Sequence, residues 1–515
     1  MQHIVQGATS IAGRNSIVNV RAAAPDNVNT DTLLGYTEWQ VGVPGPNHMQ
    51  GGVMDVFVVL ASLLLLMLAA YRGYSVILFA PLCAMLGVLL TDPAAVLPMF
   101  SGVFMEKLVS FVKLYFPVFV LGAVFGKVIE LSGFSRSIVS AVIGLVGKQR
   151  AILSIVLVCA LLTYGGVSLF VVVFAVYPFA AEMFRQGDIP KRLIPATIGL
   201  GAFTFTMAAM PGSPQIQNII PTTFFGTTTW AAPFLGLLGS AFIAVAGIAY
   251  LEARRRQAAR AGEGYGAGHR NEPEALDNVD LPHPLLAVSP LLVVAVLNWL
   301  FTRLIPVYFG NAVTLTVSGQ PLTVQVTPMV AIWAVQGALL AGIVWVCLFA
   351  FKPVATRFAE GSSSAVGGAL LASLNTASEY GFGGVIAALP GFTAITGLLK
   401  SIPNPLLNEA VSVSVLAGVT GSASGGMSIA LAALAETFIV NANAAGIPME
   451  VLHRVASMAS GGMDTLPHNG AVITLLAVTG LTHKQAYRDI FVITVLIATS
   501  AVLVVIAAYY LFGLV

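Results

Sequence analysis

Long uninterrupted apolar runs constrain this chain more than any other feature of its sequence. A helix that spans a bilayer needs roughly 20 predominantly apolar residues. The runs that approach this length are Met54–Ala70, Ser75–Leu90, Phe234–Tyr250, Pro284–Leu304, Met329–Phe351 and Ile490–Leu511. Only 9% of the 515 residues are charged, whereas soluble domains have about 25%. Because so few charges cannot cover an ordinary water-facing surface, we predict an all-α polytopic membrane protein.

The rest of the composition argues against several other classes of protein. The net charge is +2, so nothing indicates nucleic acid as a partner. The three cysteines all lie in apolar runs and indicate small hydrophobic side chains, not a disulfide framework or a metal site. The sequence has no phosphate-binding loop of the ATPase type, so we do not expect a pump driven by ATP. We expect no enzymatic activity and no cofactor, and we expect the lipid bilayer as the surrounding medium.

Polarity divides the chain into four parts. Residues 1–53 are polar and lack the continuous apolar core of a signal peptide, so we expect a disordered tail. Residues 54–250 form a first transmembrane unit and residues 284–515 a second. The linker 251–283 contains four closely spaced arginines directly after an apolar run, which places it in the cytoplasm. The insertion 306–327 alternates β-branched and polar residues around Ser-Gly-Gln-Pro and predicts an external hairpin.

The two transmembrane units resemble each other in sequence. Matching segments are "YGGVS" with "SGGMS", "DIPKRLIP" with "GIPMEVLH" and "MAAMPG" with "MDTLPHNG". The separations are 260, 258 and 256 residues for the pairs Gly165/Gly425, Pro190/Pro448 and Pro211/Pro467. This common order and spacing indicate a duplication. Because the first unit ends at the cytoplasmic linker and the second begins there, the copies run in opposite directions, as in an inverted-topology repeat.

Each unit contains two polar breaks at apparent membrane depth. They are Thr163–Ser168 and Met210–Asn218 in the first unit, and Thr420–Ser428 and Met463–Gly470 in the second. Inside lipid, irregular backbone persists only where protein or water surrounds it. Paired discontinuities at matching positions indicate the substrate site of a transporter. We therefore expect broken or re-entrant helices near the middle of the membrane.

The glycine-rich breaks suit an anionic ligand. A helix that begins in mid-membrane presents free N–H groups and the positive end of its dipole, which hold an anion without a full positive charge. The predicted anion-binding residues are Ser424, Gly425, Gly426 and Ser428 in one unit and Gly165, Gly166 and Ser168 in the other. The alternative for these small residues is a tight crossing of two helices.

The first proline break favours a polar site more strongly. Gln215, Gln217 and Asn218 follow one another there, and in a dry helix interface their amide groups would lose their hydrogen bonds with water. We therefore expect these three side chains to bind substrate.

Few ionisable residues lie at membrane depth, and three of them are candidates for carrying a proton. Asp464 and His468 flank the proline of the second proline break, and Glu379 follows "LNTAS". A charge within the bilayer is costly unless it pairs or faces a cavity, and histidine titrates near neutral pH. The alternative is that Asp464 caps the following helix. We expect Arg454, which precedes this break, to mark a membrane boundary, and the alternative is that it contacts a carboxylate.

The stretch "MPGSPQIQNIIPTTFFGTTTWAAP" resembles the gluconate permease family of the ion transporter superfamily, and within it the permeases for short hydroxy acids such as 3-hydroxybutyrate. "MDTLPHNGAVITLL" is similar to that family's late polar break. The resemblance implies a secondary carrier of the bacterial inner membrane that imports sugar acids or short hydroxycarboxylates with protons. The positions that it implicates are Ser213, Gln215, Gln217, Asn218, Asp464, Thr465, His468 and Asn469.

These features together predict a proton-coupled symporter for a small organic anion. Sodium coupling is the alternative, because the hydroxyls of Ser424 and Ser428 and nearby backbone carbonyls also suit a sodium ion. A membrane enzyme or a channel is the alternative from another class. The identity of the acid and the oligomeric state, a homodimer included, stay open at this point.

Overall fold

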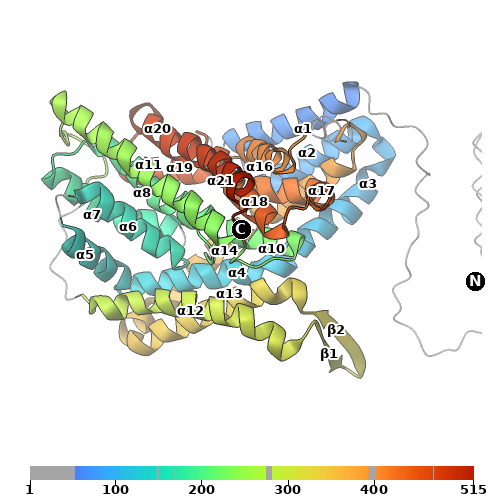
Figure 1. The fold of residues 1–515 in the computed structure, drawn as a ribbon, viewed down its shortest axis with the longest axis horizontal. Helices are drawn as coiled ribbons and strands as arrows, with labels where there is room; N and C mark the ends of the chain where they lie inside the picture. Colours follow the sequence, from blue (N-terminus) through green and yellow to red (C-terminus); the bar gives the residue numbers. More distant parts are fainter. Residues whose placement is uncertain are drawn as a thin grey trace, which may run out of the picture. The chain divides into compact units, whose positions relative to one another are not determined.

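The computed structural model describes residues 53–72, 74–147, 150–167, 169–273, 281–392, 394, 402–467 and 469–515. The predicted tail 1–53 lies outside the described residues apart from Val53, as do Ser168 and His468. Within the described ranges, helices account for all the regular structure except one two-stranded β-hairpin (Figure 1). The prediction of an all-α protein is confirmed.

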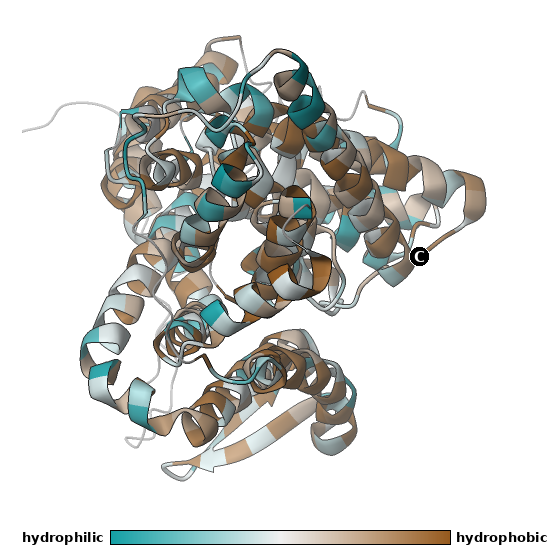
Figure 2. Cartoon of the chain, turned by 90° about the vertical axis from the view of Figure 1, so that its left-hand side faces the viewer, coloured by the Kyte–Doolittle hydropathy of each residue, from teal (hydrophilic) through white to brown (hydrophobic). Residues whose placement is uncertain are grey.

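Six of the described helices are long and apolar enough to cross a membrane. They are Pro93–Leu131, Pro233–Arg260, Pro284–Phe309, Thr327–Phe349, Ala423–Ala444 and His483–Phe512. Large apolar side chains such as Leu285 and Leu348 are more than two thirds exposed, and apolar residues occur along most of the helices in Figure 2. Such a surface suits lipid as the solvent.

The two predicted units contain the following elements. The first unit consists of α1 (Val53–Tyr71), α2 (Val76–Thr91), η1 (Pro93–Ala95), α3 (Val96–Pro98), η2 (Met99–Phe104), α4 (Met105–Leu131), α5 (Phe134–Val146), α6 (Ala151–Tyr164), α7 (Leu169–Gln186), η4 (Lys191–Leu193), α8 (Ile194–Ala202), α9 (Phe205–Ala208), α10 (Ile216–Phe225) and α11 (Pro233–Arg260). The second consists of α12 (Pro284–Phe309), β1 (Ala312–Val317), β2 (Gln320–Gln325), η5 (Thr327–Met329), α13 (Val330–Phe349), α14 (Phe351–Ala388), α16 (Pro405–Thr420), α17 (Ala423–Ala444), α18 (Met449–Met463), α19 (Gly470–Thr479), α20 (His483–Phe491), η6 (Val492–Ile497) and α21 (Ala498–Phe512).

In each unit two helices precede a long helix, α4 or α14, and the two long helices pack against each other. A pair joined at a glycine break comes next, after the additional helix α5 in the first unit, then a helix interrupted at a proline break, then a final apolar helix. The duplication and the opposite orientation of the two copies stay predictions.

Two predicted boundaries shift in the structure. α11 continues through the arginines to Arg260, so the irregular part of the linker begins later than residue 251. The predicted insertion 306–327 does contain a hairpin, in which β1 and β2 pair antiparallel with Ala312 opposite Gln325. Its first residues, however, belong to α12, which ends at Phe309.

The helix pairs α6–α7 and α16–α17 start from opposite ends of the helix bundle. α6 begins beside the linker end of α11, where Arg150 and Glu252 line the same pocket. α16 begins at the other end, where Asn404 is hydrogen-bonded to Tyr510 of the last helix. The two pairs lie on different sides of the bundle in Figure 1, and each turns back at its glycine break, as expected for re-entrant segments.

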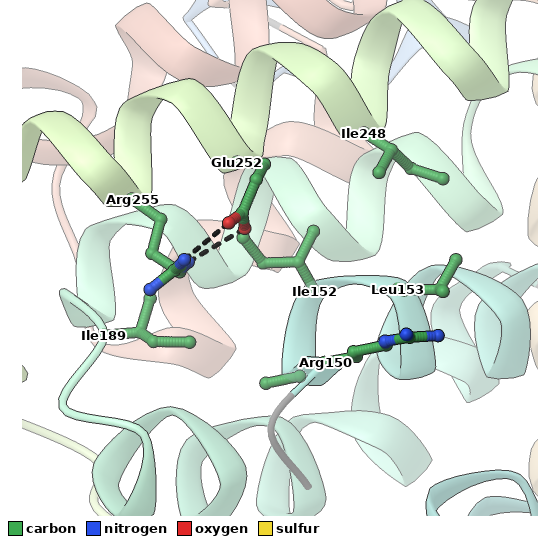
Figure 3. A pocket seen from close by; sticks show the side chains of 8 residues that line it. Arg150, Ile152, Leu153, Ile189, Ile248, Glu252 and Arg255 are labelled. Carbon is green, nitrogen blue, oxygen red and sulfur yellow. Dashed lines mark hydrogen bonds and ion pairs between the residues drawn. The ribbon is translucent and has the colours of Figure 1, made fainter. Parts of the chain in front are cut away.

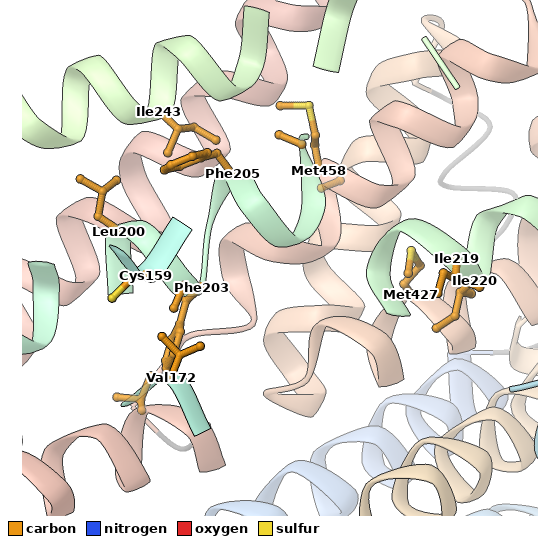
Figure 4. Packing of buried hydrophobic residues seen from close by; sticks show 14 of the residues in the cluster. Cys159, Val172, Leu200, Phe203, Phe205, Ile219, Ile220, Ile243, Met427 and Met458 are labelled. Atoms are coloured by element: carbon orange, nitrogen blue, oxygen red, sulfur yellow. The ribbon is translucent and has the colours of Figure 1, made fainter. Parts of the chain in front are cut away.

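Glycines allow two of these helices to meet their neighbours at backbone distance. A Cβ atom at Gly426 of α17 would overlap the backbone of Ala417 in α16, and one at Gly201 of α8 would lie 2.5 Å from the Cβ of Cys159 in α6. Apolar side chains fill the surrounding core, and Figure 4 shows Met427 of α17 beside Ile219 and Ile220 of α10. The fold thus requires glycine at these contacts.

The described part of the linker is tied to both units by ion pairs and hydrogen bonds. We call residues 261–273 the linker strap. Lys191 forms an ion pair with Glu272 of the strap at 2.7 Å, and Asn271 donates to the carbonyl of Ala477 in α19 at 2.8 Å. Hydrogen bonds from Arg192 lower the pKa of Glu263 in the strap. The strap therefore holds ends of elements from both units together.

Beside the strap, Asp489 of α20 is buried and accepts hydrogen bonds from Arg192 at 2.9 Å and Arg254 at 2.7 Å. We expect Asp489→Asn to lower the free energy of unfolding by about 2 kcal/mol, because Arg254 loses its described counter-charge and Arg192 keeps only Glu263. The melting temperature in detergent checks this. Glu130→Gln, which removes the exposed ion pair with Lys127, is the control, with an expected change of about 0.5 kcal/mol or less. Equal effects of the two variants would contradict the prediction.

Candidate functional site

One side chain joins the two breaks of the first unit. Nε2 of Gln215 donates to the carbonyl oxygens of Thr163 at 2.7 Å and Val167 at 3.4 Å, which lie on either side of the glycine pair. The hydroxyl of Tyr164 donates to the carbonyl of Pro211 at 3.0 Å. The turn of the α6–α7 hairpin therefore lies against the first proline break.

The second unit repeats this arrangement. Nδ2 of Asn469, in the second proline break, donates to the carbonyl of Gly421 at 2.7 Å, in the turn of the α16–α17 hairpin. Oδ1 of Asn469 accepts from the backbone N–H of Val472 at 2.8 Å and so caps α19. Because Asn469 is the cap, the alternative that Asp464 caps this helix is wrong. Thr465 of the same break is buried and bonded to Thr494 at 2.6 Å.

The two proline breaks also approach each other. The hydroxyl of Ser457 in α18 donates to the carbonyl of Ala208, the last residue of α9, at 2.7 Å. A Cβ at Gly461, near the end of α18, would lie 3.1 Å from the Cβ of Ala208. α9 leads into the first proline break and α18 into the second, so the structure brings these two predicted breaks together across the boundary between the units.

Arg454 is the most deeply buried cation at this boundary, and the expectation that it marks a membrane edge is wrong. Its side chain is completely buried. Nε and Nη2 donate to the carbonyl of Ala231 at 3.2 and 2.7 Å, and Nη1 donates to the carbonyl of Ala208 at 3.3 Å and to Oδ1 of Asn218 at 3.1 Å. All these acceptors are neutral, and among the described residues no carboxylate forms an ion pair with it.

Asn218 is the centre of the hydrogen bonds around Arg454. Its Nδ2 donates to the carbonyls of Ser213 at 3.0 Å and Thr229 at 2.8 Å, and its Oδ1 also contacts Nε2 of His453 at 3.2 Å. Since Oδ1 only accepts, Nε2 of His453 donates, and the neutral ring then accepts at Nδ1 from the hydroxyl of Thr227 at 2.6 Å. Asn218 therefore uses its whole amide group to hold α10 against α18.

Glu379 lies at the N-terminal end of α17. Its side chain is 4% exposed and is hydrogen-bonded to Ser422, the N-cap residue of that helix. A Cβ at Gly425 would overlap the carboxylate, so Oε2 rests directly against this glycine. Oε2 has no hydrogen-bond partner. The predicted anion-binding end of α17 thus already holds a carboxylate of the chain itself.

Asp464 is the second buried carboxyl group of the predicted site. It follows the last residue of α18, is 8% exposed, and accepts hydrogen bonds from its own backbone N–H and that of Thr465. Its Oδ1 has no partner. No described basic side chain pairs with it.

Several other buried polar atoms around the breaks also lack a hydrogen-bond partner. They include Thr163 Oγ1, Gln217 Oε1, Ser428 Oγ, Ser373 Oγ and Ser378 Oγ. Buried polar atoms in native proteins are nearly all paired, so unpaired ones commonly mark a site for water or a ligand. Of the predicted amide side chains, Gln217 keeps a free acceptor, whereas Asn218 and Asn469 are occupied within the protein.

Two details of the predicted site need correction. Ser424, Gly425, Gly426 and Ser428 are not in unwound backbone but in the first turns of α17, and only Gly421 and Ser422 interrupt the helices there. Ser213 does not offer its hydroxyl, because it donates to the carbonyl of Thr206 at 2.7 Å. Gly165 and Gly166 do form the turn of the first hairpin, and Gly166 has the positive φ of 95° that favours glycine.

Sequence reasoning missed Glu409 of α16. It is completely buried, and both of its carboxylate oxygens lack a hydrogen-bond partner. It follows "NPLLN", which contains the start of α16, and an acidic residue there is usually exposed. Only the packing of α16 between neighbouring helices shows that this side chain lies inside.

A separate pocket of about 250 Å3 opens at the linker end of the bundle. Figure 3 shows Arg150 on one side of it and the Glu252–Arg255 pair on the other, with Ile152 between them. None of the predicted site residues lines this pocket. It is therefore distinct from the site at the helix breaks.

Comparison with known proteins agrees with this architecture. The chain is 56% identical over 473 residues to the uncharacterized transporter YxjC of Bacillus subtilis, covering 90% of this chain and 100% of YxjC. A crystal structure of the YdaH transporter of Alcanivorax borkumensis superposes with a TM-score of 0.50 at 14% identity, covering 82% of this chain and 90% of that one, and shows a shared fold. No family model matches the sequence. The chain is a multi-pass membrane protein and belongs to the family of transporters that includes YxjC.

Proposed function

We propose that this transporter is a secondary carrier that moves a small organic anion together with a proton, in the manner of the gluconate permease family that its proline breaks resemble. The substrate is a hydroxy monocarboxylate such as 3-hydroxybutyrate, or a sugar acid such as gluconate. The observation that carries the proposal is the set of buried charges: Arg454 is bound to neutral acceptors only, and Glu379, Glu409 and Asp464 have no basic partner among the described residues.

Arg454 supports an anionic substrate. An uncompensated charge inside a protein is costly because little solvent screens it. A bound carboxylate near the proline breaks compensates this charge, and the free N–H groups at helix ends there supply hydrogen bonds to it. A neutral substrate would leave the guanidinium without a counter-charge.

The buried carboxyl groups support proton coupling. A carboxylate without a basic partner is costly to keep ionised at membrane depth, whereas its protonated form is neutral. Such a group takes up a proton when it meets water on one side of the membrane and releases it on the other. Sodium bound to the same oxygens is the alternative coupling ion.

Uptake into vesicles that contain the purified protein tests the coupling ion. We expect saturable uptake of 3-hydroxybutyrate or gluconate under an inward proton gradient without sodium. A sodium gradient at constant pH is the comparison. Uptake that depends on sodium and not on the pH gradient would identify sodium as the coupling ion in place of the proton. Flux that does not saturate with substrate concentration would indicate a channel.

The role of Arg454 is tested by comparing each acid with its uncharged amide. In the wild type we expect the acid to bind more tightly by about 10- to 100-fold, the range of a hydrogen bond to a charged group. Arg454→Met should bring this ratio close to 1, while Arg454→Lys, which keeps the charge, should retain most of it. His453→Gln disturbs the same hydrogen bonds without removing the charge and should leave the ratio unchanged. If Arg454→Met keeps the wild-type ratio of acid affinity to amide affinity, the arginine has only a structural role.

A further inference from the structure

We propose that the side chain of Glu379 occupies the place where the substrate's carboxylate binds. When Glu379 is ionised, it fills the N-terminal end of α17. When it binds a proton, it leaves that end free for the substrate anion. This inference rests on the proposed function and specifies how the proton and the anion are coupled. It assigns to Glu379 the role of a competitor for the substrate's place.

The geometry places the carboxylate where a substrate anion is expected. α17 has 22 residues, and its first N–H groups lack partners within the helix. Ser422 satisfies one of them, since its hydroxyl accepts from the N–H of Gly425 at 3.0 Å. Glu379 reaches this end from α14 and lies against Gly425, where any larger residue would displace it.

Two unpartnered atoms show that this end of the helix has unused binding capacity. Oε2 of Glu379 accepts no hydrogen bond although it is buried, and the completely buried hydroxyl of Ser428, in the next turn of α17, is also unpartnered. On the other side, Thr376 and Ser424 face each other at 3.3 Å between their hydroxyl oxygens. A ligand hydroxyl group would donate to Oε2 of Glu379, and a ligand carboxylate would accept from the hydroxyl of Ser428.

No described cation holds Glu379 in its charged form. α14 packs against α4, α2, α13 and α17. The titratable groups on these elements and beside Glu379 are Glu106, Lys107, Lys113, Tyr115, Lys127 and Glu130 on α4, Cys83 on α2, Cys347 on α13, Glu436 on α17, and Tyr380, Lys352, Arg357 and Glu360 on α14 itself. Lys107 is directed at the ring of Tyr380, 6.0 Å from its centre, and Lys127 pairs with Glu130. The attraction for the carboxylate of Glu379 therefore comes from the N-terminal end of α17. The same helix end attracts a substrate carboxylate equally.

The carboxylate of Glu379 and the substrate anion compete for the same helix end, and this competition couples binding of the proton to binding of the anion. Two carboxylates at one helix end repel each other, so the substrate anion binds when the proton has converted Glu379 to its neutral form. The proton passes from water to a carboxylate oxygen of Glu379, and no covalent bond other than O–H is made or broken. When the substrate leaves, Glu379 loses the proton to water and returns to the helix end.

Binding measured as a function of pH tests this inference. The probes are lactate, 3-hydroxybutyrate and gluconate, added to the purified full-length protein between pH 5.5 and 8.5, with the thermal shift as the readout. For the wild type we expect the affinity for the acid that binds to fall by about tenfold per pH unit at the alkaline end, as for a single competing ionisation. In Glu379→Gln, which cannot ionise, the affinity should be the same at every pH and should match that of the wild type at pH 5.5.

A second variant and a control keep the test decisive. Glu379→Asp shortens the side chain, withdraws the carboxylate from Gly425 and should weaken the pH dependence even if Glu379→Gln does not fold. Glu436→Gln removes an exposed carboxylate from the same helix and should keep the wild-type pH dependence. Wild-type protein that binds none of the three acids would refute the proposed function, and this inference with it. Wild-type binding whose pH dependence persists in Glu379→Gln or Glu379→Asp would overturn the inference alone.

Discussion

Uptake driven by an inward proton gradient should fall to the level of protein-free vesicles in the variant Asp464→Asn, while exchange of labelled for unlabelled substrate continues at a reduced rate. The amide has nearly the same shape as the carboxyl group, so the second proline break should keep its structure. It cannot bind and release a proton, however, and the unpartnered Oδ1 of Asp464 is buried where an ionised form is costly. Uptake in vesicles with an imposed pH difference, measured beside counterflow without one, checks both parts.

The control for this experiment is Glu436→Gln, an exposed carboxylate of α17 that should leave both activities unchanged. Glu379→Gln should also lose driven uptake, but the two carboxyl groups differ in binding. Asp464→Asn should keep the pH dependence of substrate binding, which Glu379→Gln should remove. Driven uptake that persists in Asp464→Asn would exclude Asp464 from proton coupling.

The substitution Gly426→Ala should prevent most of the protein from folding. Its Cβ would overlap the backbone of Ala417 in the neighbouring helix, and a backbone cannot move aside as a flexible side chain does. We expect the free energy of unfolding to fall by about 3 kcal/mol or more. The yield of monodisperse protein in detergent and its melting temperature measure the effect.

Gly368→Ala is the matched control, because Gly368 lies within α14 and an added Cβ would meet no atom within 4 Å. Alanine favours a helix over glycine by up to about 1 kcal/mol, so this variant should be as stable as the wild type or slightly more stable. A Gly426→Ala protein with an unchanged melting temperature would mean that α16 and α17 do not meet at backbone distance.

The sequence was sufficient to predict the helical membrane fold and all four helix breaks, because long apolar runs and clusters of glycine, proline and amide residues are local signals. It also predicted the β-hairpin, since the alternation of residue types acts over short distances. The extent of each break was less accurate. The residues Ser424 to Ser428 were predicted as irregular backbone, yet Ser422 caps α17 one turn earlier and makes them helical.

The errors concern contacts between distant segments. The sequence could not show that Arg454 points into the boundary between the units, because its partners lie 223 to 246 positions away. For the same reason, the bond from Asn469 to Gly421 and the role of Asn218 as a clamp between α10 and α18 were not visible. Glu379 was proposed as a proton carrier, but its position at the end of α17 depends on the packing of α14 against that helix.

The backbone contacts at Gly426 and Gly201 have a consequence for how such a carrier moves. Helices pressed together at these points interlock and cannot slide past each other, so α16 with α17, and α6 with α8, should travel as rigid bodies. We therefore expect movement along the seam where α9 and α10 face α18, since the side-chain hydrogen bonds there can be replaced by new partners or water.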